Sequence, residues 1–127
     1  MINLVELYAI LRLVALHHDI ISYRELSVRY LQRTEEQHHW HGTWDAPLGQ
    51  LNGHTQANGL PAISAVVTYQ IDEDDPDSQF GPPGNEFWGS PGVPARPATA
   101  QQRELVWMGI VGQVHQANWP EHLRGLV

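Results

Sequence analysis

The stretch NGLPAISAVVTY, residues 58–69, decides the fold that the sequence predicts. Its opening Asn-Gly pair is typical of a helix end, because glycine readily adopts the left-handed conformation that follows the last turn. Its second half, Ile63–Tyr69, is short and rich in β-branched residues, which predicts a strand. The chain therefore changes here from helix to strand, and the elements on either side set the topology.

Three amphipathic helices are predicted before this strand. Apolar residues recur at three- and four-residue spacing over residues 3–17, which is the period of a helix with one buried face. The run Ser22–Glu25 has the capping-box pattern and starts a second helix that ends near Thr34. A third helix covers residues 45–58, with Pro47 in its first turn, where a missing amide costs no hydrogen bond.

The segment after the strand has a different composition. Residues 71–100 contain six Pro, four Gly and the acidic run Asp72–Asp77, which excludes regular structure across most of it. Long loops inside domains are usually functional or disordered, and three large aromatic side chains here argue against plain disorder. A last helix begins after Thr99, which starts a further capping pattern, and ends before Trp119-Pro120.

The order helix, helix, helix, strand and long hairpin-like loop matches a winged-helix layout. We therefore expect an α+β fold, a mostly helical winged-helix-like domain with a small antiparallel sheet and a long Pro/Gly-rich loop over residues 71–98. A length of 127 residues fits one domain, so residues 1–127 are expected to share one core. The alternative is a helical domain with a small sheet and no recognition role.

The composition excludes several classes of site. The chain has no Cys and no Lys, and seven Arg against fourteen acids give a net charge of -7. Disulfides and thiolate metal sites are therefore excluded, and the negative charge argues against a general nucleic-acid coat. Glu6 and Arg12 interrupt the apolar N-terminal stretch, so neither a signal peptide nor a membrane span is expected. We expect a cytoplasmic protein that needs no cofactor.

The favoured function is protein binding through the aromatic loop, by a non-enzymatic module or a small accessory or inhibitor protein. Large aromatic side chains on a stiff Pro/Gly backbone resemble the anchors that carry most of the energy of protein interfaces. The expected partner-binding residues all lie in this loop: Phe80, Pro83, Gly84, Glu86, Phe87 and Trp88. The expected partner is therefore another protein.

DNA binding is the alternative, because a winged-helix fold presents its third helix, here residues 45–58, to the bases. This helix offers Gln50, Asn52 and Gln56 for base edges, but it contains no Arg or Lys. Three arginines of the preceding helix are available for phosphates: Arg24, Arg29 and Arg33. A homodimer would pair two such arginine sets. The acidic loop that would form the wing opposes this function, because it would face phosphates.

A metal-dependent enzyme is the third interpretation. The segment EEQHHWH, residues 35–41, is rich in metal ligands: Glu35, His38, His39 and His41. A zinc site needs three or four converging ligands, and no HExxH spacing occurs. The alternative is a polar linker between two helices, with Trp40 and Trp44 packed on the core. Neither a nucleophile elbow nor a phosphate-binding loop occurs, so we do not expect an enzyme.

Five short runs follow a recurring pattern: Ile21–Leu26, Leu48–Leu51, Gly59–Val67, Pro83–Trp88 and Glu104–Trp107. They resemble small bacterial and phage proteins with the pattern tYgeLa, a spacer, GLPpLsalVv and a PGxGF loop. The chain departs from this pattern in its acids at 72–77 and in Asn85-Glu86, where a glycine is expected. The resemblance implies a winged-helix-like fold. The first run is also similar to the helix that precedes the recognition helix in winged-helix proteins, including alkyltransferase-like DNA proteins. The Pro-Cys-His-Arg active-site motif of true alkyltransferases is absent, so that chemistry is not expected.

Overall fold

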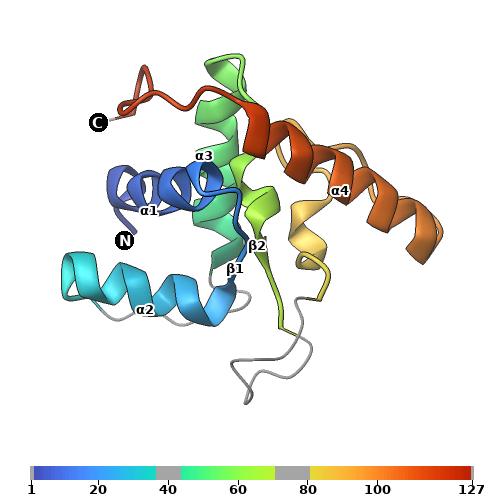
Figure 1. Ribbon diagram of the computed structural model, residues 1–127, viewed down its shortest axis with the longest axis horizontal. Coiled ribbons are helices and arrows are strands. Elements are labelled where there is room, and N and C mark those ends of the chain that lie inside the picture. The colour runs from blue at the N-terminus through green and yellow to red at the C-terminus, as the bar shows by residue number, and fades with distance from the viewer. Residues whose placement is uncertain (1, 37–43, 71–80, 127) are drawn as a thin grey trace.

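The computed structural model describes residues 2–36, 44–70 and 81–126 (Figure 1). The elements follow in the order α1 (Leu4–Leu16), β1 (Ile21–Ser22), α2 (Tyr23–Thr34), α3 (Asp45–Ala57), the 3-10 helix η2 (Ile63–Val66), β2 (Val67–Thr68), the 3-10 helix η3 (Asn85–Phe87) and α4 (Ala100–Gln116). The described part of the chain is therefore mostly helical, with one small sheet, as predicted. In Figure 1, α1 and α2 lie on the left, α3 runs through the middle and α4 extends to the right.

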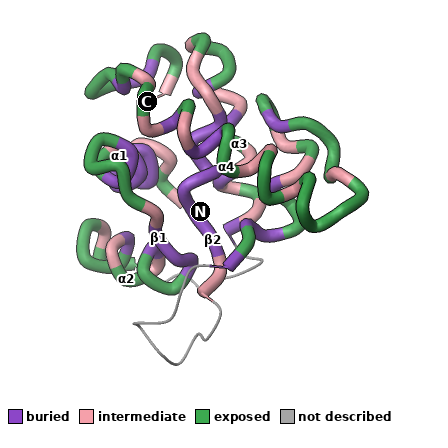
Figure 2. Tube along the Cα trace, turned by 45° about the vertical axis from the view of Figure 1, so that its right-hand side comes forward, coloured by how far each residue is buried: buried purple, intermediate pink, exposed green. Residues whose placement is uncertain are grey.

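The segment from Ala62 to Thr68, which contains η2 and β2, lies at the centre of the molecule. Every residue in it is at most 5% exposed. The helices α1, α3 and α4 all pack against η2, while α2 packs against α1 and β2. Figure 2 shows buried residues along this central segment and on the inner faces of the helices. The core is therefore organised around a short irregular segment.

The two strands run parallel, so the predicted antiparallel sheet is wrong. Ile21 pairs with Val67, and Ser22 pairs with Thr68. The chain between these strands contains α2, α3 and η2, which form the long crossover that parallel strands require. The predicted winged-helix layout is not supported either, because its wing is an antiparallel hairpin. Over the described residues, the sheet consists of this parallel pair alone.

The predicted strand at Ile63–Tyr69 is wrong over its first half. Residues Ile63–Val66 form η2, and only Val67–Thr68 form a strand. The β-branched residues fit this turn because it is buried on all sides by helices, and packing overrides local strand preference. No strand lies beside η2 among the described residues, so its backbone needs other hydrogen-bond partners.

The four predicted α-helices are confirmed in the described residues. They were predictable because local sequence signals determine where each helix begins and ends. Side chains cap three of the N-termini: Asn3 for α1, Ser22 for α2 and Thr99 for α4. Gly59 follows α3 with a φ of 71°, the left-handed conformation expected after a helix end. Among the described helices, none is both long and apolar enough to cross a membrane.

Asn52 on α3 supplies partners for the central segment. Its side chain is fully buried, and its Oδ1 accepts the backbone N–H of Ser64 at 3.1 Å. Its Nδ2 donates to the hydroxyls of Ser64 at 2.7 Å and Ser90 at 3.1 Å. One amide therefore connects α3, η2 and the turn after η3. Asn52 was expected to face DNA base edges, but in this fold its side chain is fully buried and is not accessible to a base.

Trp44 fixes the other end of α3. It is fully buried, its ring lies edge-on to Tyr30 at 5.5 Å, and its Nε1 donates to Ser27 Oγ at 2.8 Å. A buried indole N–H needs such a partner, and here the partner comes from α2. The sequence-based expectation that Trp44 packs on the core is confirmed, whereas Trp40 lies outside the described residues.

The Asn52→Ala variant should lose about 2–3 kcal/mol of unfolding free energy. The substitution leaves the buried Ser64 N–H without its acceptor and two hydroxyls without their donor. Urea denaturation followed by circular dichroism would measure the loss. Gln50→Ala, an exposed change on the same helix, is the matched control and should change stability by less than about 0.5 kcal/mol. Equal stability of the two variants would contradict the structural role of Asn52.

Candidate functional site

An open pocket of about 400 Å³ lies between the start of α4 and the loop that follows β2. Its walls are largely aromatic and proline side chains: Pro82, Pro83, Trp88 and Trp107. Two arginines, Arg96 and Arg103, also line it. A volume of this size is typical of small-ligand and peptide-side-chain pockets. The described residues thus contain a concave site in the same loop that the sequence indicated.

The Trp107 wall is fixed by the central segment. The indole Nε1 donates to the backbone carbonyl of Ala65 in η2 at 2.8 Å, and the ring is half-buried. Trp88 is also half-buried, and its ring lies edge-on to Phe87 at 5.1 Å. Phe87 is only 6% exposed and belongs to the core. Each tryptophan therefore has one side attached to the core and another side on the pocket.

The loop at the pocket mouth is attached to the end of the sheet. Tyr69 N–H donates to the carbonyl of Pro82 at 3.2 Å, and Gly81 N–H donates to the carbonyl of Tyr69 at 2.6 Å. Gly84 N–H donates to the hydroxyl of Tyr23 at 3.1 Å. An added Cβ at Gly84 would lie 2.8 Å from that hydroxyl, so the close approach requires glycine. These contacts hold the prolines in place.

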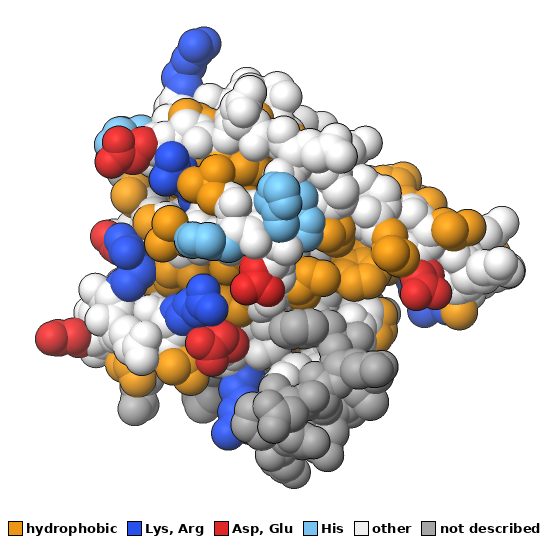
Figure 3. Space-filling model, viewed as in Figure 1, with side chains coloured by type: hydrophobic (Ala, Val, Ile, Leu, Met, Phe, Trp, Pro, Cys, Tyr) orange, Lys and Arg blue, Asp and Glu red, His pale blue; other side chains and the backbone are white. Residues whose placement is uncertain are grey.

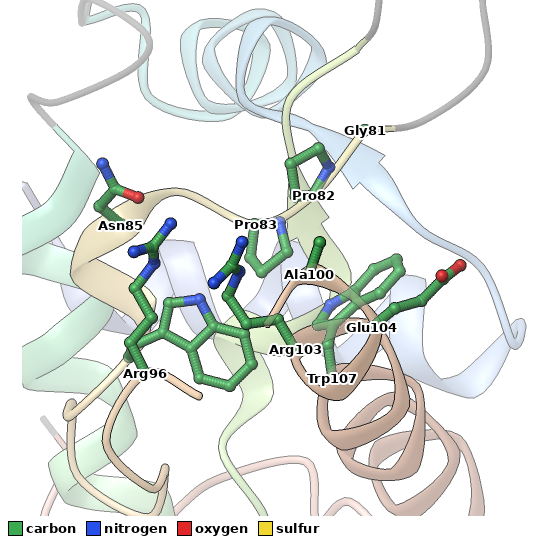
Figure 4. A pocket seen from close by; sticks show the side chains of 10 residues that line it. Gly81, Pro82, Pro83, Asn85, Arg96, Ala100, Arg103, Glu104 and Trp107 are labelled. Atoms are coloured by element: carbon green, nitrogen blue, oxygen red, sulfur yellow. The ribbon is translucent and has the colours of Figure 1, made fainter. Parts of the chain in front are cut away.

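The two arginines give the pocket its charge. Arg103 donates from Nη1 to the backbone carbonyls of Pro97 at 3.0 Å and Ala98 at 3.3 Å. Arg96 is exposed and has no hydrogen-bond or ion-pair partner among the described residues. Figure 4 shows the guanidinium group of Arg103 beside Pro83 and that of Arg96 turned toward Asn85, while the carboxylate of Glu104 points away from both. The pocket therefore combines apolar walls with positive charge that is not neutralised by Glu104.

Two polar residues behind the loop, Tyr23 and Asp45, have raised pKa values. Burial raises the pKa of Tyr23 above its usual value of 10.0, and the hydrogen bond from Gly84 only partly opposes this shift. Burial also raises the pKa of Asp45, and the nearby Glu86 carboxylate raises it further. Tyr23 is 4% exposed, so its hydroxyl serves the loop backbone and not the solvent.

The residues predicted to bind a partner are placed in different environments. Pro83 and Trp88 line the pocket, although Pro83 is itself largely buried, and Glu86 is exposed but does not line it. Gly84 and Phe87 are buried, so their side chains are not available to a partner. Phe80 lies outside the described residues. The predicted interface loop therefore contributes one wall of a pocket.

Sequence reasoning missed the opposite wall of the pocket. Arg103 and Trp107 lie on α4, and Arg96 precedes that helix. The spacing of Arg103 and Trp107 puts them on one helix face, a signal that could have grouped them. The position of that face beside Trp88 depends on how α4 packs on η2, which no local pattern encodes.

The residues predicted to bind DNA are mostly engaged elsewhere. Arg29 pairs with Glu25 at 3.3 Å, and Arg33 pairs with Glu6 at 2.7 Å. Arg24 is exposed at the start of α2, and Gln50 and Gln56 are exposed on α3. Asn52, the remaining member of the set, is the buried core residue described above. The two ion pairs therefore engage two of the three arginines that were expected to contact phosphates.

The predicted metal ligands do not form a metal site among the residues that the structure describes. Glu35 ends α2 in the left-handed conformation with a φ of 61°. His38, His39 and His41 lie outside the described residues. Over residues 2–36, 44–70 and 81–126, no group of three or more His, Asp or Glu side chains is placed to hold a metal ion.

No protein-family model, curated protein sequence or solved structure matches this chain. The resemblance to small bacterial and phage proteins therefore stays a prediction.

The Gly84→Ala variant should be less stable by about 1–3 kcal/mol. Its new methyl group would meet the Tyr23 hydroxyl at 2.8 Å and the rings of Tyr23 and Tyr69 at 3.5 Å, so the loop must shift. Gly49→Ala on α3 is the control, because its Cβ would meet nothing within 4 Å. That change should be neutral or slightly stabilising. Thermal denaturation of both variants would measure the difference, and an unperturbed Gly84→Ala protein would contradict the close approach.

Stability should decrease as the pH rises above about 10, in part because of Tyr23. The unfolded chain releases this phenolic proton near its usual pKa of 10.0, whereas burial makes the folded chain retain it. The stabilising contribution is thus complete below that pKa and is lost at higher pH. Urea denaturation across this range should give a shallower pH slope for Tyr23→Phe than for the native sequence. Identical slopes would contradict the raised pKa.

Proposed function

We propose that the protein is a non-enzymatic protein-binding module. Its pocket between Trp88 and Trp107 receives an extended, proline-containing segment of a partner protein that also carries a carboxylate. The observation that supports this most is the combination of two tryptophans and two prolines with Arg96 and Arg103 around one cavity.

The apolar walls suit an extended proline-rich segment. Such segments adopt the polyproline II helix before binding, so they lose little conformational entropy when they dock into aromatic grooves. Tryptophan rings offer large, rigid surfaces, and the two indoles here are already held by Phe87 and by the carbonyl of Ala65. Little ordering of the pocket is then needed on binding, which favours affinity.

The arginines suit a single carboxylate and not a polyanion. A guanidinium group matches a carboxylate with two parallel hydrogen bonds, and Arg96 has its donors free among the described residues. Nucleic acids need many cations along a phosphate backbone, whereas this chain has a net charge of -7. An acidic side chain or a C-terminal carboxylate is therefore the anion that the pocket fits.

DNA recognition through residues 45–58 has weaker support. It would need a winged-helix arrangement, which the parallel strand pair does not support. Of the polar residues of α3 expected to read bases, Asn52 is buried, and Gln50 and Gln56 are exposed. Salt bridges to acidic residues occupy Arg29 and Arg33. The pocket residues are a more coherent set, because they surround one cavity.

The proposal predicts that a peptide-display library is enriched for proline-containing sequences with a nearby Asp or Glu. Arg96→Glu should weaken binding of an enriched peptide by about tenfold or more, because it replaces an attraction by a repulsion. Trp88→Ala should cost about 2 kcal/mol of binding free energy. Isothermal titration calorimetry would measure both losses, and circular dichroism would confirm that each variant is folded.

Arg124→Glu is the matched control for Arg96→Glu. It makes the same charge change at an exposed arginine that does not line the pocket. Its affinity for the peptide should stay within about twofold of the native protein at moderate salt. If both charge reversals weakened peptide binding equally, the effect would come from net charge and the proposed role of the pocket would be contradicted. A peptide library that shows no enrichment would also contradict the proposal.

A further inference from the structure

The helix α4 has a second apolar face that the protein's own core does not cover. Leu105 is 66% exposed and Met108 is 57% exposed. Together with Gly109 and Gly112 they follow the i, i+3, i+4, i+7 spacing of one helix face. The opposite face contains the buried residues Ile110, Val111 and Val114. Figure 3 shows hydrophobic side chains on the part of α4 that extends to the right.

The two glycines on this face are not required by the fold described above. An added Cβ at Gly109 or Gly112 would meet nothing within 4 Å, and neither residue has a positive φ. Glycine inside a helix lowers helix stability relative to alanine, so the monomer gains nothing from it. A close approach of another backbone is the usual reason for glycine at such a position.

We propose that this face binds a second copy of the chain, with the two α4 helices packed antiparallel. The large residues lie toward one end of the face and the small residues toward the other. In an antiparallel pair centred between Met108 and Gly109, Leu105 of each copy faces Gly112 of the other. Met108 likewise faces Gly109 of the second copy. A reversed copy of the same face therefore fits large residues against small ones along its whole length.

The separation of like charges supports the same arrangement. Glu104 and His115 border this face on one side, near opposite ends of α4. The antiparallel pairing brings each Glu104 toward the end of the second helix that carries His115, whose Nε2 lies 2.9 Å from the Asp19 carbonyl oxygen and whose ring stacks on His18. The two Glu104 carboxylates therefore do not meet. On the other side, Gln102 and Gln113 face each other. The helix dipoles also run in opposite directions, which is the favourable orientation for neighbouring helices. A parallel pairing would place Glu104 beside Glu104.

The dimer should be weak, because one helix pair buries less surface than a standard stable interface. Sedimentation velocity from about 1 µM to about 500 µM should show a rise from monomer toward dimer. Leu105→Gln and Gly112→Gln should each raise the dissociation constant by about tenfold or more. Gly112→Gln should also raise the melting temperature, since it improves helix propensity in open space. If Gly112→Gln were monomeric because it is partly unfolded, its melting temperature would instead fall.

Leu31→Gln is the matched control for Leu105→Gln. Leu31 is 38% exposed on α2, which lies away from α4 in Figure 1. This variant should self-associate like the native protein. A native protein that stays monomeric at every concentration overturns the proposal and leaves the face to a different protein. Variants at Leu105 and Gly112 that dimerise normally also overturn it.

Disulfide trapping tests the antiparallel register directly, because the chain has no native Cys. A mixture of the Leu105→Cys and Gly112→Cys variants should form a cross-linked heterodimer under mild oxidation. A mixture of Leu31→Cys with Gly112→Cys should not. Cross-linking of Leu105→Cys to itself in preference to the mixed pair would indicate a parallel arrangement and overturn the proposed one. The Arg96→Glu variant should dimerise normally, so this outcome is independent of the peptide-binding proposal.

Discussion

The buried backbone of residues 62–68 is the constraint on which the rest of the structure depends. Its polar groups cannot reach water, and only its last two residues join the sheet among the described elements. Asn52 therefore accepts the Ser64 N–H, and Trp107 donates to the Ala65 carbonyl. An unpaired group at such a depth costs as much as a lost hydrogen bond or more. The positions of α3 and α4 around η2 follow from these two contacts as well as from apolar packing.

The same constraint connects the core to the pocket. The indole N–H of Trp107 donates a hydrogen bond to η2, and the rest of its half-buried ring lines the cavity. On the other wall, the Tyr23 hydroxyl accepts from Gly84, while Tyr69 holds Gly81 and Pro82 through the backbone. Both walls are therefore attached to elements that cannot move without breaking buried hydrogen bonds. A pocket supported in this way is preorganised, which reduces the entropy lost on binding.

The helices were predictable from the sequence because their signals are local. Caps such as Ser22 and Thr99 and the left-handed Gly59 act within one turn. The sheet was not predictable, because the pairing of Ile21 with Val67 joins residues that are distant in sequence. Likewise, β-branched residues suit both a strand and a buried 3-10 turn, and only the surrounding helices decide between them. The aromatic loop was recognised as a site, whereas its partner wall on α4 required the packing of that helix on η2.

The helix α4 shows why a single hydrophobic periodicity was insufficient to predict which surfaces a helix contacts. One side of the helix contacts the core at Ile110 and Val114 and, nearer its N-terminus, lines the pocket with Arg103 and Trp107. The opposite side carries the exposed Leu105. A helix with apolar residues around most of its circumference normally has more than one neighbour, because water is a poor solvent for the uncovered side. Glu104 lies between two of these surfaces: it lines the pocket and borders the exposed face. Its carboxylate points away from the two pocket arginines in Figure 4, so its charge acts on the border of the exposed face, where the proposed antiparallel pair keeps the two Glu104 side chains apart.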